Sequence, residues 1–322
     1  MQRRQFLRTG LATPAVLSTA PAYSAQKKKS ALDKLQIAVL GSGLRGQSHI
    51  DLLLRRDDAT VTASADIDPE MIRRTKKLFA KHGAAAPTIY DQGPKDYLRL
   101  LEEEDIDAVL IATPWRWHTP MAVAAMRKGL YTGTEVCGAF SLDECWELVR
   151  THEATGSELF FLENVCYRRD VMAVLNMVRQ GIFGELLHLE GGYQHDLRAV
   201  KFNDGQQPYG GGVEFGSKAF HEARWRTTHS VHRNGDLYPT HGVGPVANYL
   251  NINRGNRFVS LTSMASKARG LHDYIVHHPA GGKDHPNAKV EFKLGDKVTT
   301  MLSTSKGETV VLHHDTNLPR PY

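Results

Sequence analysis

A glycine-rich turn between an apolar run and an amphipathic segment limits the fold of this chain more than any other feature. Residues 35–40 have a strand pattern, and Gly41, Gly43 and Gly46 follow directly in a GxGxxG arrangement. Residues 47–56 then have the pattern of a helix. In this strand–turn–helix context, the motif is typical of dinucleotide-binding domains, because the glycines let backbone amides approach a pyrophosphate at a helix N-terminus.

An acidic residue stands where such domains bind a ribose. Residues 60–65 predict a second strand, which ends at Asp66, twenty residues after Gly46. A carboxylate at this spacing hydrogen-bonds the ribose 2′-hydroxyl and repels a 2′-phosphate. The sequence therefore predicts NAD rather than NADP as the cofactor. A glycine-rich turn with an acidic helix cap is the structural alternative.

Strands and helices go on alternating up to residue 162. Helices are predicted from 68 to about 82, at 120–128 and at 141–155, and strands at 107–112, 130–134 and 159–162. This alternation predicts an α/β Rossmann domain with a doubly wound parallel sheet. Ligands bind at the carboxyl ends of such strands, so candidate site segments are 113–118, 135–137 and 163–164.

The second half of the chain has a different pattern. One helix is predicted at 169–180, followed by strands at 185–194, 258–266, 289–294, 298–304 and 309–314. These predict an α+β domain with an open, largely antiparallel sheet. Residues 203–244 are rich in Gly and His without a regular pattern, and we expect a long functional loop over the cleft. The expected domains are an NAD-binding Rossmann domain at 35–164 and a substrate-binding α/β sheet domain at 165–322.

The N-terminus predicts export. The pair Arg3-Arg4, a weakly apolar stretch and small residues near a cleavage position resemble a twin-arginine signal peptide over residues 1–25, with a linker at 26–34. We therefore expect the twin-arginine machinery as a partner and a periplasmic or extracellular location. Removing this segment lowers the formal net charge from +5 to +2, so the positive net charge of the whole chain says little about other partners.

Other classes of partner find no support in the sequence. Lysines 27–29 lack the interleaved aromatic residues of a nucleic-acid site, and no run of about 18 apolar residues predicts a membrane span. The 16 histidines raise the possibility of a metal-dependent hydrolase, but there is no HExxH, and His229 and His232 lack a clear third ligand. We predict no metal site. A homo-oligomer is compatible with the sequence, which does not fix the oligomeric state.

Longer strings resemble a known enzyme family. Residues 112–114 (Ala-Thr-Pro) with His118, and Glu135 after the strand at 130–134, are similar to the Gfo/Idh/MocA oxidoreductases. Within that superfamily, residues 162–172, 225–227, 233–242 and 248–257 resemble glycoside hydrolase family 109, the NAD-dependent α-N-acetylgalactosaminidases. The similarity extends over nearly the whole chain after about residue 35.

The resemblance implies a hydrolase that uses redox chemistry without net oxidation. NAD would accept a hydride from C3 of the sugar, the C2 proton would be lost, and the group on C1 would leave. Water would then add, and the hydride would return to C3. The implied substrate is a glycan with a terminal α-linked N-acetylgalactosamine. A net sugar dehydrogenase of the Gfo/Idh/MocA type is the main alternative, and a non-enzymatic sugar- or NAD-binding module is another.

The resemblance also implies site residues. Besides the three glycines, the implied NAD contacts are Leu44, Arg45, Asp66, Trp115, Trp117, His118, Glu135, Val136 and Asn164. The implied sugar contacts are Glu163, Tyr193, Arg226, Tyr238, His241 and Tyr322. Catalytic roles are expected for His241, Tyr193, Glu163 and Tyr322.

The residue types fit these roles, although structural roles remain open. His241 is expected in a constrained loop, where an imidazole can accept a hydroxyl proton near neutral pH, or serve as a structural histidine. Tyr193 and Tyr238 suit acid–base work, stacking on a sugar, or packing. Arg226 can form a fork onto sugar oxygens or a surface ion pair. Glu163 follows a strand as a site acid or as a helix-terminal acid.

Two departures from the family pattern matter. Oxidoreductases of the superfamily carry Glu-Lys-Pro where this chain has Glu135-Val136-Cys137, and the missing lysine favours the glycosidase branch over net dehydrogenation. The family 109 pattern has proline at Cys137, so we expect a small shift of the nicotinamide edge. Relatives also continue beyond Tyr322, so we expect the sheet domain to be incomplete, with a raw edge on its last strand.

Overall fold

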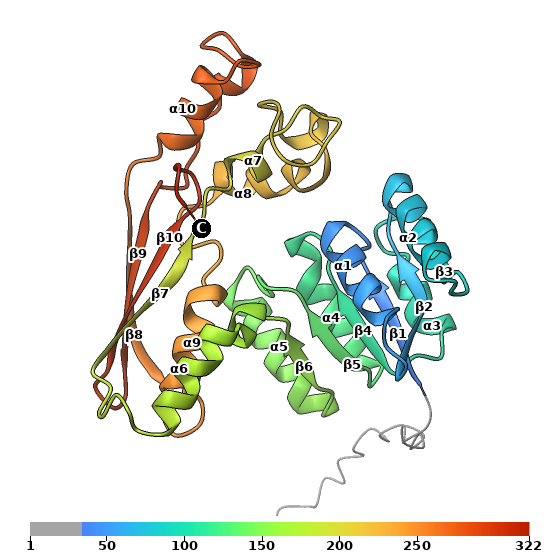
Figure 1. Cartoon of the computed structure of the whole chain (residues 1–322), viewed down its shortest axis with the longest axis horizontal. Helices are drawn as coiled ribbons and strands as arrows, with labels where there is room; N and C mark the ends of the chain where they lie inside the picture. Colours follow the sequence, from blue (N-terminus) through green and yellow to red (C-terminus); the bar gives the residue numbers. More distant parts are fainter. Residues whose placement is uncertain (1–33, 322) are drawn as a thin grey trace, which may run out of the picture.

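The computed structural model describes residues 34–321, which form two β-sheets with helices packed against them (Figure 1). The predicted signal peptide, most of the linker and Tyr322 lie outside the described residues. Within the described part, no helix is both long enough and apolar enough to cross a bilayer.

The first sheet is the predicted Rossmann sheet. Its six strands are all parallel in the order β3-β2-β1-β4-β5-β6, and they are β1 (Leu35–Leu40), β2 (Ala59–Ala65), β3 (Thr88–Tyr90), β4 (Ala108–Ile111), β5 (Tyr131–Thr134) and β6 (Leu159–Phe161). The helices between them are α1 (Leu44–Leu53), α2 (Pro69–Lys81), α3 (Tyr97–Glu103), α4 (His118–Arg127) and α5 (Leu142–Thr155). The predicted fold class is therefore confirmed for this half.

Alternating side chains on β1 explain why helices cover both faces of the sheet. Ala38 and Leu40 pack with the buried residues of α3 and α4, whereas Val39 packs on the other face with Ile50 of α1 and Phe79 of α2. Successive side chains of a strand point to opposite faces, so a run of apolar residues needs cover on both. The last four residues of β1 are consequently buried at the centre of the sheet, and its carboxyl end opens into the turn that carries the glycines.

Two predicted helix starts are formed as capped ends. The Asp68 carboxylate accepts a hydrogen bond from the Glu70 amide at 2.9 Å, and Pro69 is the first residue of α2. The Ser141 hydroxyl accepts a hydrogen bond from the Glu144 amide at 3.2 Å, and α5 begins at the next residue. These local caps fix where the helices begin and therefore where the preceding loops face the ligand crevice.

The second sheet is mixed. Its order is β7-β10-β9-β8, built from β7 (His188–Gln194), β8 (Phe258–Ala265), β9 (Val298–Thr304) and β10 (Thr309–Asp315). The pairs β8–β9 and β9–β10 are antiparallel, and β7–β10 is parallel. The raw edge expected on the last strand is wrong, because β10 is paired on both sides. Two helices, α6 (Arg169–Arg179) and α9 (Thr240–Tyr249), lie between this sheet and the Rossmann domain (Figure 1).

The segment 203–244, expected as a structureless loop, contains several short helical segments. It contains the short helices η3 (Gly216–Lys218), η4 (His221–Arg224) and α8 (Arg226–His232), and it follows α7 (Arg198–Lys201). His241 lies in the first turn of α9 rather than in a loop. Two glycines and Pro245 within α9 have low helix propensity, so packing onto β7 and β10 outweighs the local sequence signal.

The strand predicted at 289–294 is wrong. The structure has a 3-10 turn at η5 (Pro286–Lys289), and no strand follows it before β9. Phe292 packs against Phe202, Leu271 and Ile275 in a separate apolar cluster beside α10 (Gly270–His277). The amides of residues 293 and 294 both donate to the Ser230 carbonyl, so the alternating pattern reflects packing against helices and not a fifth strand.

Candidate active site

A cavity of about 420 Å³ lies at the carboxyl ends of the Rossmann strands. Its walls come from the turns that follow β1, β2, β4 and β5, and from the η4–α8 segment of the second half. Most of the predicted cofactor contacts line it: Gly41, Gly43, Leu44, Arg45, Asp66, Trp115, Trp117, His118, Glu135 and Val136. The remaining two do not, because Gly46 is buried under the turn and Asn164 is exposed beside β6.

Backbone geometry explains the glycines. Gly41 has a φ of +86°, and a Cβ there would lie 2.8 Å from the Ala112 carbonyl oxygen. A Cβ on Gly46 would lie 2.0 Å from the Gly41 carbonyl oxygen, so α1 can pack on the turn only with glycine at position 46. At Gly43, in contrast, a Cβ would have only the imidazole of His221 within 4 Å. The turn thus leaves open the place where a pyrophosphate would approach.

Asp66 is held as a rigid acceptor at the end of β2. Its Oδ2 accepts from the Ser42 amide at 2.7 Å and lies 3.2 Å from the Ser42 hydroxyl, while its Oδ1 accepts from the Asp68 amide at 2.9 Å. Burial raises the pKa of this carboxyl, and the hydrogen bonds from the amides oppose that shift. The side chain faces the cavity, in a position that suits the predicted contact with a ribose.

His118 ties two strand-end loops together. It is only 1% exposed, and its ring nitrogens lie 2.8 Å from the Thr113 carbonyl oxygen and 3.2 Å from that of Cys137. Burial lowers the pKa of the ring, and a neutral imidazole donates to only one of these two carbonyl oxygens. As the structure stands, His118 shapes the cavity wall through its position and ring carbons, while its polar atoms face the protein.

The sequence departure at Cys137 has a structural counterpart. Cys137 has a φ of +68°, a conformation closed to proline, which is restricted to about −65°. Its thiol donates to the Leu237 carbonyl oxygen at 2.8 Å, and burial raises its pKa to about 12. Cys137 is therefore an inert link between the two halves of the molecule.

Glu135 is positioned by a residue that the sequence reasoning missed. Its Oε1 lies 2.8 Å from Nε2 of His49 on α1 and 3.4 Å from Nε of Arg45. The next residue, Val136, is 2% exposed and apolar where the superfamily's oxidoreductases have lysine. His49 sits one turn beyond the glycine motif, and only its helical spacing from Arg45 could have suggested this role.

Glu163 and His241 form a pair between the two halves. Nδ1 of His241 lies 2.7 Å from Oε1 and 2.9 Å from Oε2 of Glu163, and the carboxylate, 8% exposed, also accepts from the Val165 amide at 3.0 Å. A carboxylate at Nδ1 favours the tautomer with the proton on that atom. This leaves the lone pair of Nε2 available to accept a proton, as in other histidine–carboxylate pairs.

Two tyrosines flank His241. The ring centroids of Tyr193, Tyr238 and His241 lie 4.8–5.0 Å apart, and both tyrosines meet the imidazole edge to face. The Tyr193 hydroxyl is 3.3 Å from Nδ1 of His195. Burial raises the pKa of Tyr238, so this phenol is neutral at physiological pH. The three rings form one aromatic wall, and Tyr238 extends it into the main cavity.

Arg226 joins that wall to the cofactor cavity. Its guanidinium lies 4.9 Å from the centroid of a Trp115 ring and 5.5 Å from that of Tyr238, and Nε is 2.7 Å from a carboxylate oxygen of Glu222. Both Arg226 and Tyr238 also line a second, much smaller cavity of about 10 Å³ together with Tyr193. Arg226 is thus a stacked, largely buried cation and not a surface ion pair.

Close backbone contacts at glycines allow α9 to place His241 beside Tyr193. A Cβ on Gly242 would lie 2.7 Å from the Gly192 amide nitrogen, and a Cβ on Gly191 would lie 2.9 Å from the Gly242 carbonyl oxygen. Helix α9 and strand β7 therefore approach backbone to backbone. The close approach sets the distance between His241 on the helix and Tyr193 near the end of the strand.

The structure thus brings together most of the predicted sugar contacts. Glu163, Tyr193, Arg226, Tyr238 and His241 form a continuous group, whereas Tyr322 lies outside the described residues. His49, Glu222 and His221, which contact members of the site, carried no motif signal. Within residues 34–321, no group of three or more His, Cys, Asp or Glu side chains is arranged to hold a metal ion.

Two family models match this architecture. Residues 35–162 match an oxidoreductase family with an NAD-binding Rossmann fold, and residues 167–322 match the C-terminal domain of glycosyl hydrolase 109. The glycine turn suits a pyrophosphate and Asp66 suits a ribose, which agrees with the match to an NAD-binding family.

Relatives with known names agree. A glycosyl hydrolase family 109 protein from Stenotrophomonas maltophilia is 52% identical over 328 residues, which cover all of this chain and 71% of the relative. A protein named alpha-N-acetylgalactosaminidase from Tannerella forsythia is 53% identical over 310 residues, which cover 94% of this chain and 66% of the relative. The chain therefore spans about two thirds of the length of these relatives.

Solved structures show the same fold. Myo-inositol dehydrogenase from Lactobacillus casei, in complex with NAD(H) and myo-inositol, has a TM-score of 0.59 at 17% identity, with 88% of this chain and 68% of that chain covered. Scyllo-inositol dehydrogenase from the same organism, with bound NAD(H) and scyllo-inositol, has a TM-score of 0.60 at 11% identity, with 88% and 71% covered. The family models and relatives confirm the resemblance in the sequence: the chain belongs to glycoside hydrolase family 109 and joins an NAD-binding Rossmann domain to that family's C-terminal domain.

Proposed function

We propose that this protein hydrolyses terminal α-linked N-acetylgalactosamine through oxidation at C3, elimination, water addition and reduction, with no net redox change. The observation that carries the proposal is the Glu163–His241 pair, which lies beside an aromatic wall that runs into the cofactor cavity. NAD, when bound, supplies a hydride acceptor and later a hydride donor. The name of the Tannerella forsythia relative supports the choice of sugar.

His241 is the proposed base. With Nδ1 held by Glu163, its Nε2 accepts the proton of the sugar hydroxyl as that carbon is oxidised, and it returns the proton when the carbon is reduced. Glu163 fixes the orientation and tautomer of the imidazole and stabilises its protonated form. Because the hydroxyl loses its proton and regains it in each cycle, a reversible base suits this reaction.

The aromatic wall and Arg226 bind and orient the sugar. Tyr193 and Tyr238 provide flat, largely apolar surfaces with hydroxyl groups at their edges, which suit the faces and rims of a pyranose. Arg226, fixed over Trp115, offers donors for a sugar oxygen or for the acetamido carbonyl.

The apolar Val136 supports a cycle without net oxidation. It presents no ammonium group at the position where the superfamily's oxidoreductases carry a lysine. In the proposed function, the pair from β6 and α9 does the proton transfer instead.

The test is an assay with an aryl α-N-acetylgalactosaminide in heavy water, using the protein with bound NAD. The elimination route requires deuterium at C2 of the released sugar, because the C2 proton is lost and replaced from solvent. Release of sugar without deuterium at C2 would rule out the proposed mechanism. Stoichiometric formation of NADH with free sugar would instead indicate a net dehydrogenase.

A further inference from the structure

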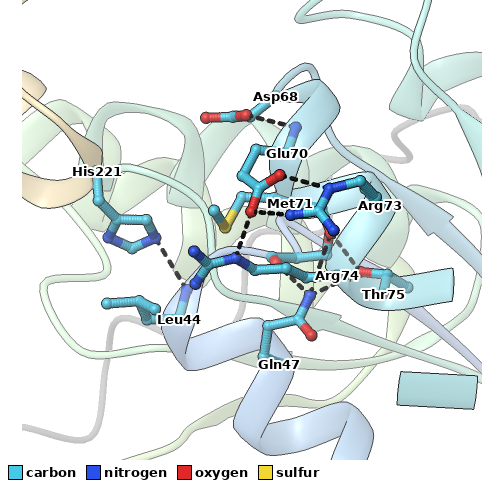
Figure 2. Close-up of polar contacts among 10 residues, drawn as sticks. Leu44, Gln47, Asp68, Glu70, Met71, Arg73, Arg74, Thr75 and His221 are labelled. Carbon is cyan, nitrogen blue, oxygen red and sulfur yellow. Dashed lines mark hydrogen bonds and ion pairs between the residues drawn. The ribbon is translucent and has the colours of Figure 1, made fainter. Parts of the chain in front are cut away.

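A histidine of the second half caps the first turn of the Rossmann helix. His221, the first residue of η4, accepts a hydrogen bond at Nε2 from the backbone N–H of Leu44 at 2.9 Å (Figure 2). Leu44 begins α1, so its amide is one of those without a partner inside the helix. Neither the glycine motif nor the family resemblance pointed to this contact.

The imidazole lies where the glycine motif leaves room for an anion. In a Rossmann fold the amides at the N-terminus of the first helix bind the pyrophosphate of the dinucleotide. A Cβ on Gly43 would lie 3.0 Å from Nε2 of His221 and 3.4 Å from its Cε1, with no other atom within 4 Å. The space that glycine opens for a phosphate is therefore the space that His221 enters.

The helix side of this contact is firmly held. The Gln47 side chain donates to the Ser42 carbonyl oxygen at 2.8 Å and to the Thr75 hydroxyl of α2 at 2.7 Å (Figure 2). Both ends of the glycine turn are thus tied to neighbouring elements. Any rearrangement at the contact would have to come from His221.

His221 itself is held at an energetic cost. Its φ of +52° lies in the left-handed region, which is unfavourable for a residue other than glycine. Because Nε2 accepts a hydrogen bond, the neutral ring carries its proton on Nδ1, and this buried atom has no partner among the described residues. Burial also lowers the pKa of the ring, which favours the neutral, accepting form.

We propose that His221 is an internal competitor of the cofactor: it binds the Leu44 amide in the cofactor-free protein and must leave when the NAD pyrophosphate binds there. The contact gives the Leu44 amide a hydrogen-bond partner when no cofactor is bound. The strained backbone of His221 makes the contact easy to displace. His221 then sets how fast the cofactor enters. This inference concerns NAD binding alone and holds whichever sugar the protein hydrolyses.

The test measures NAD binding to protein from which the cofactor has been removed. Stopped-flow quenching of tryptophan fluorescence can follow binding, since Trp115 and Trp117 line the cavity. His221→Ala removes the competitor, so the association rate constant and the affinity should each rise about fivefold, while the dissociation rate constant stays unchanged. His221→Asn keeps a carbonyl acceptor and tolerates a positive φ, so it should stay close to the wild type.

A matched control is His277→Ala, which makes the same substitution at a 71% exposed histidine of α10. It should leave both rate constants unchanged. If His221→Ala instead speeds NAD dissociation, His221 holds the bound cofactor and the proposal is wrong. If His221→Ala leaves both rate constants at wild-type values, the contact with Leu44 does not compete and the proposal is likewise wrong.

A second measurement needs no variant. In wild-type protein with ¹⁵N-labelled histidine, the Nε2 signal of His221 should change when NAD saturates the site, because the nitrogen loses its hydrogen bond to Leu44. An Nε2 signal that stays unchanged on saturation would overturn the proposal even if the substituted proteins failed to fold.

Discussion

The two halves of the molecule contribute different parts of the site. The Rossmann domain supplies carboxylates at the ends of its strands: Asp66 after β2, Glu135 after β5 and Glu163 after β6. The second half supplies nitrogen groups, among them Arg226 and His241. The acids stand on rigid strand ends, whereas the cations and imidazoles come from short helices.

The two halves differ in whether local contacts or the packing of distant elements position the site residues. Each strand-end acid has local partners, as when Asp66 accepts from two backbone amides of neighbouring turns. His241, in contrast, reaches Glu163 only because α9 docks closely on β7. We therefore expect substitutions at the Glu163–His241 pair to disturb catalysis more than cofactor binding, and substitution of Asp66 to do the reverse.

The largest expected effect follows from His241→Ala. Removing the proposed base should lower turnover by roughly 10²–10⁴-fold, the usual contribution of a general base. NAD affinity should change less than twofold, because His241 does not line the cofactor cavity. Steady-state kinetics and equilibrium titration with NAD measure the two effects.

Glu163→Gln provides the companion to that substitution. The amide still accepts from Nδ1 of His241 but no longer stabilises a protonated ring, so we expect a smaller loss of turnover, about 10–100-fold. If His241→Ala retained activity, or if Glu163→Gln proved the more damaging of the two, the proposed base would be misassigned.

Gly242→Ala tests whether docking of α9 matters as much as the side chains it carries. The added Cβ would lie 2.7 Å from the Gly192 amide nitrogen, so the helix must move away from β7. Displacing His241 from its partners should lower turnover by about 10²-fold, and overpacking should cost roughly 1–3 kcal/mol of stability. Kinetics and thermal unfolding follow the two losses.

Gly307→Ala is the control for Gly242→Ala. Gly307 has a φ of +104° in the β9–β10 turn, with no atom close enough to meet a Cβ. Alanine there should destabilise the protein through its backbone alone and leave the turnover of the folded fraction unchanged. Equal losses of turnover in the two variants would mean that general destabilisation, and not the position of α9, explains the effect.

The same contrast explains what the sequence could predict. The strand ends of the Rossmann half were predictable because a residue's place after a strand is a local property, as for Asp66 and Glu163. The three-residue strand β3 went unrecognised because it is too short to form a pattern. Residues 203–244 read as a loop, since the glycines and Pro245 obscured helix α9.

Contacts between side chains far apart in the sequence could not be predicted at all. His221 meets Leu44 across 177 residues of sequence, and His49 meets Glu135 across 86. Neither histidine stands in a motif, and their roles depend on how distant elements pack. The residue types therefore predicted the chemistry of the site, whereas the contacts that position those residues could be found only in the structure.

Asp66→Ala tests the strand-end side of the comparison. Losing a charged acceptor at the proposed ribose contact should weaken NAD binding about 10–100-fold, and the preference for NAD over NADP should fall. Turnover at saturating NAD should change much less. Titration with both dinucleotides measures the effect.

Glu70→Ala is the matched control, because it removes a carboxylate four residues away that pairs with Arg73 and Arg74 outside the cavity. Its affinity for NAD should equal that of the wild type. An unchanged NAD affinity in Asp66→Ala would show that the carboxylate supports only the glycine turn and makes no cofactor contact.

The smallest expected effect concerns a buried cation of the second half. Lys201 is 3% exposed, and its Nζ donates to the Thr316 hydroxyl at 2.8 Å and to Oδ1 of Asn317 at 2.5 Å. Burial lowers the pKa of Lys201 to about 7, well below the usual range of a lysine. The folded protein therefore gives up this proton at a lower pH than the unfolded chain does.

The sign of the pH dependence follows from that difference. Between about pH 7 and 10 the unfolded chain holds more protons than the folded protein, so this group makes the free energy of unfolding rise with pH. Below pH 7 both states hold the proton, and the cost of burying a charged amine is present in full. Compared with Lys201→Met, the wild type should gain roughly 1–3 kcal/mol of stability from pH 6.5 to 9.

Thermal unfolding of both proteins at several pH values measures this gain. Lys297→Met, at an exposed lysine just before β9, should show the same pH profile as the wild type. Parallel profiles for the wild type and Lys201→Met would mean that the buried amine keeps its proton up to the usual pH. In that case burying the charged amine of Lys201 would not lower the stability of the protein. The contrast between acids on strand ends and buried cations on short helices would then have no energetic basis.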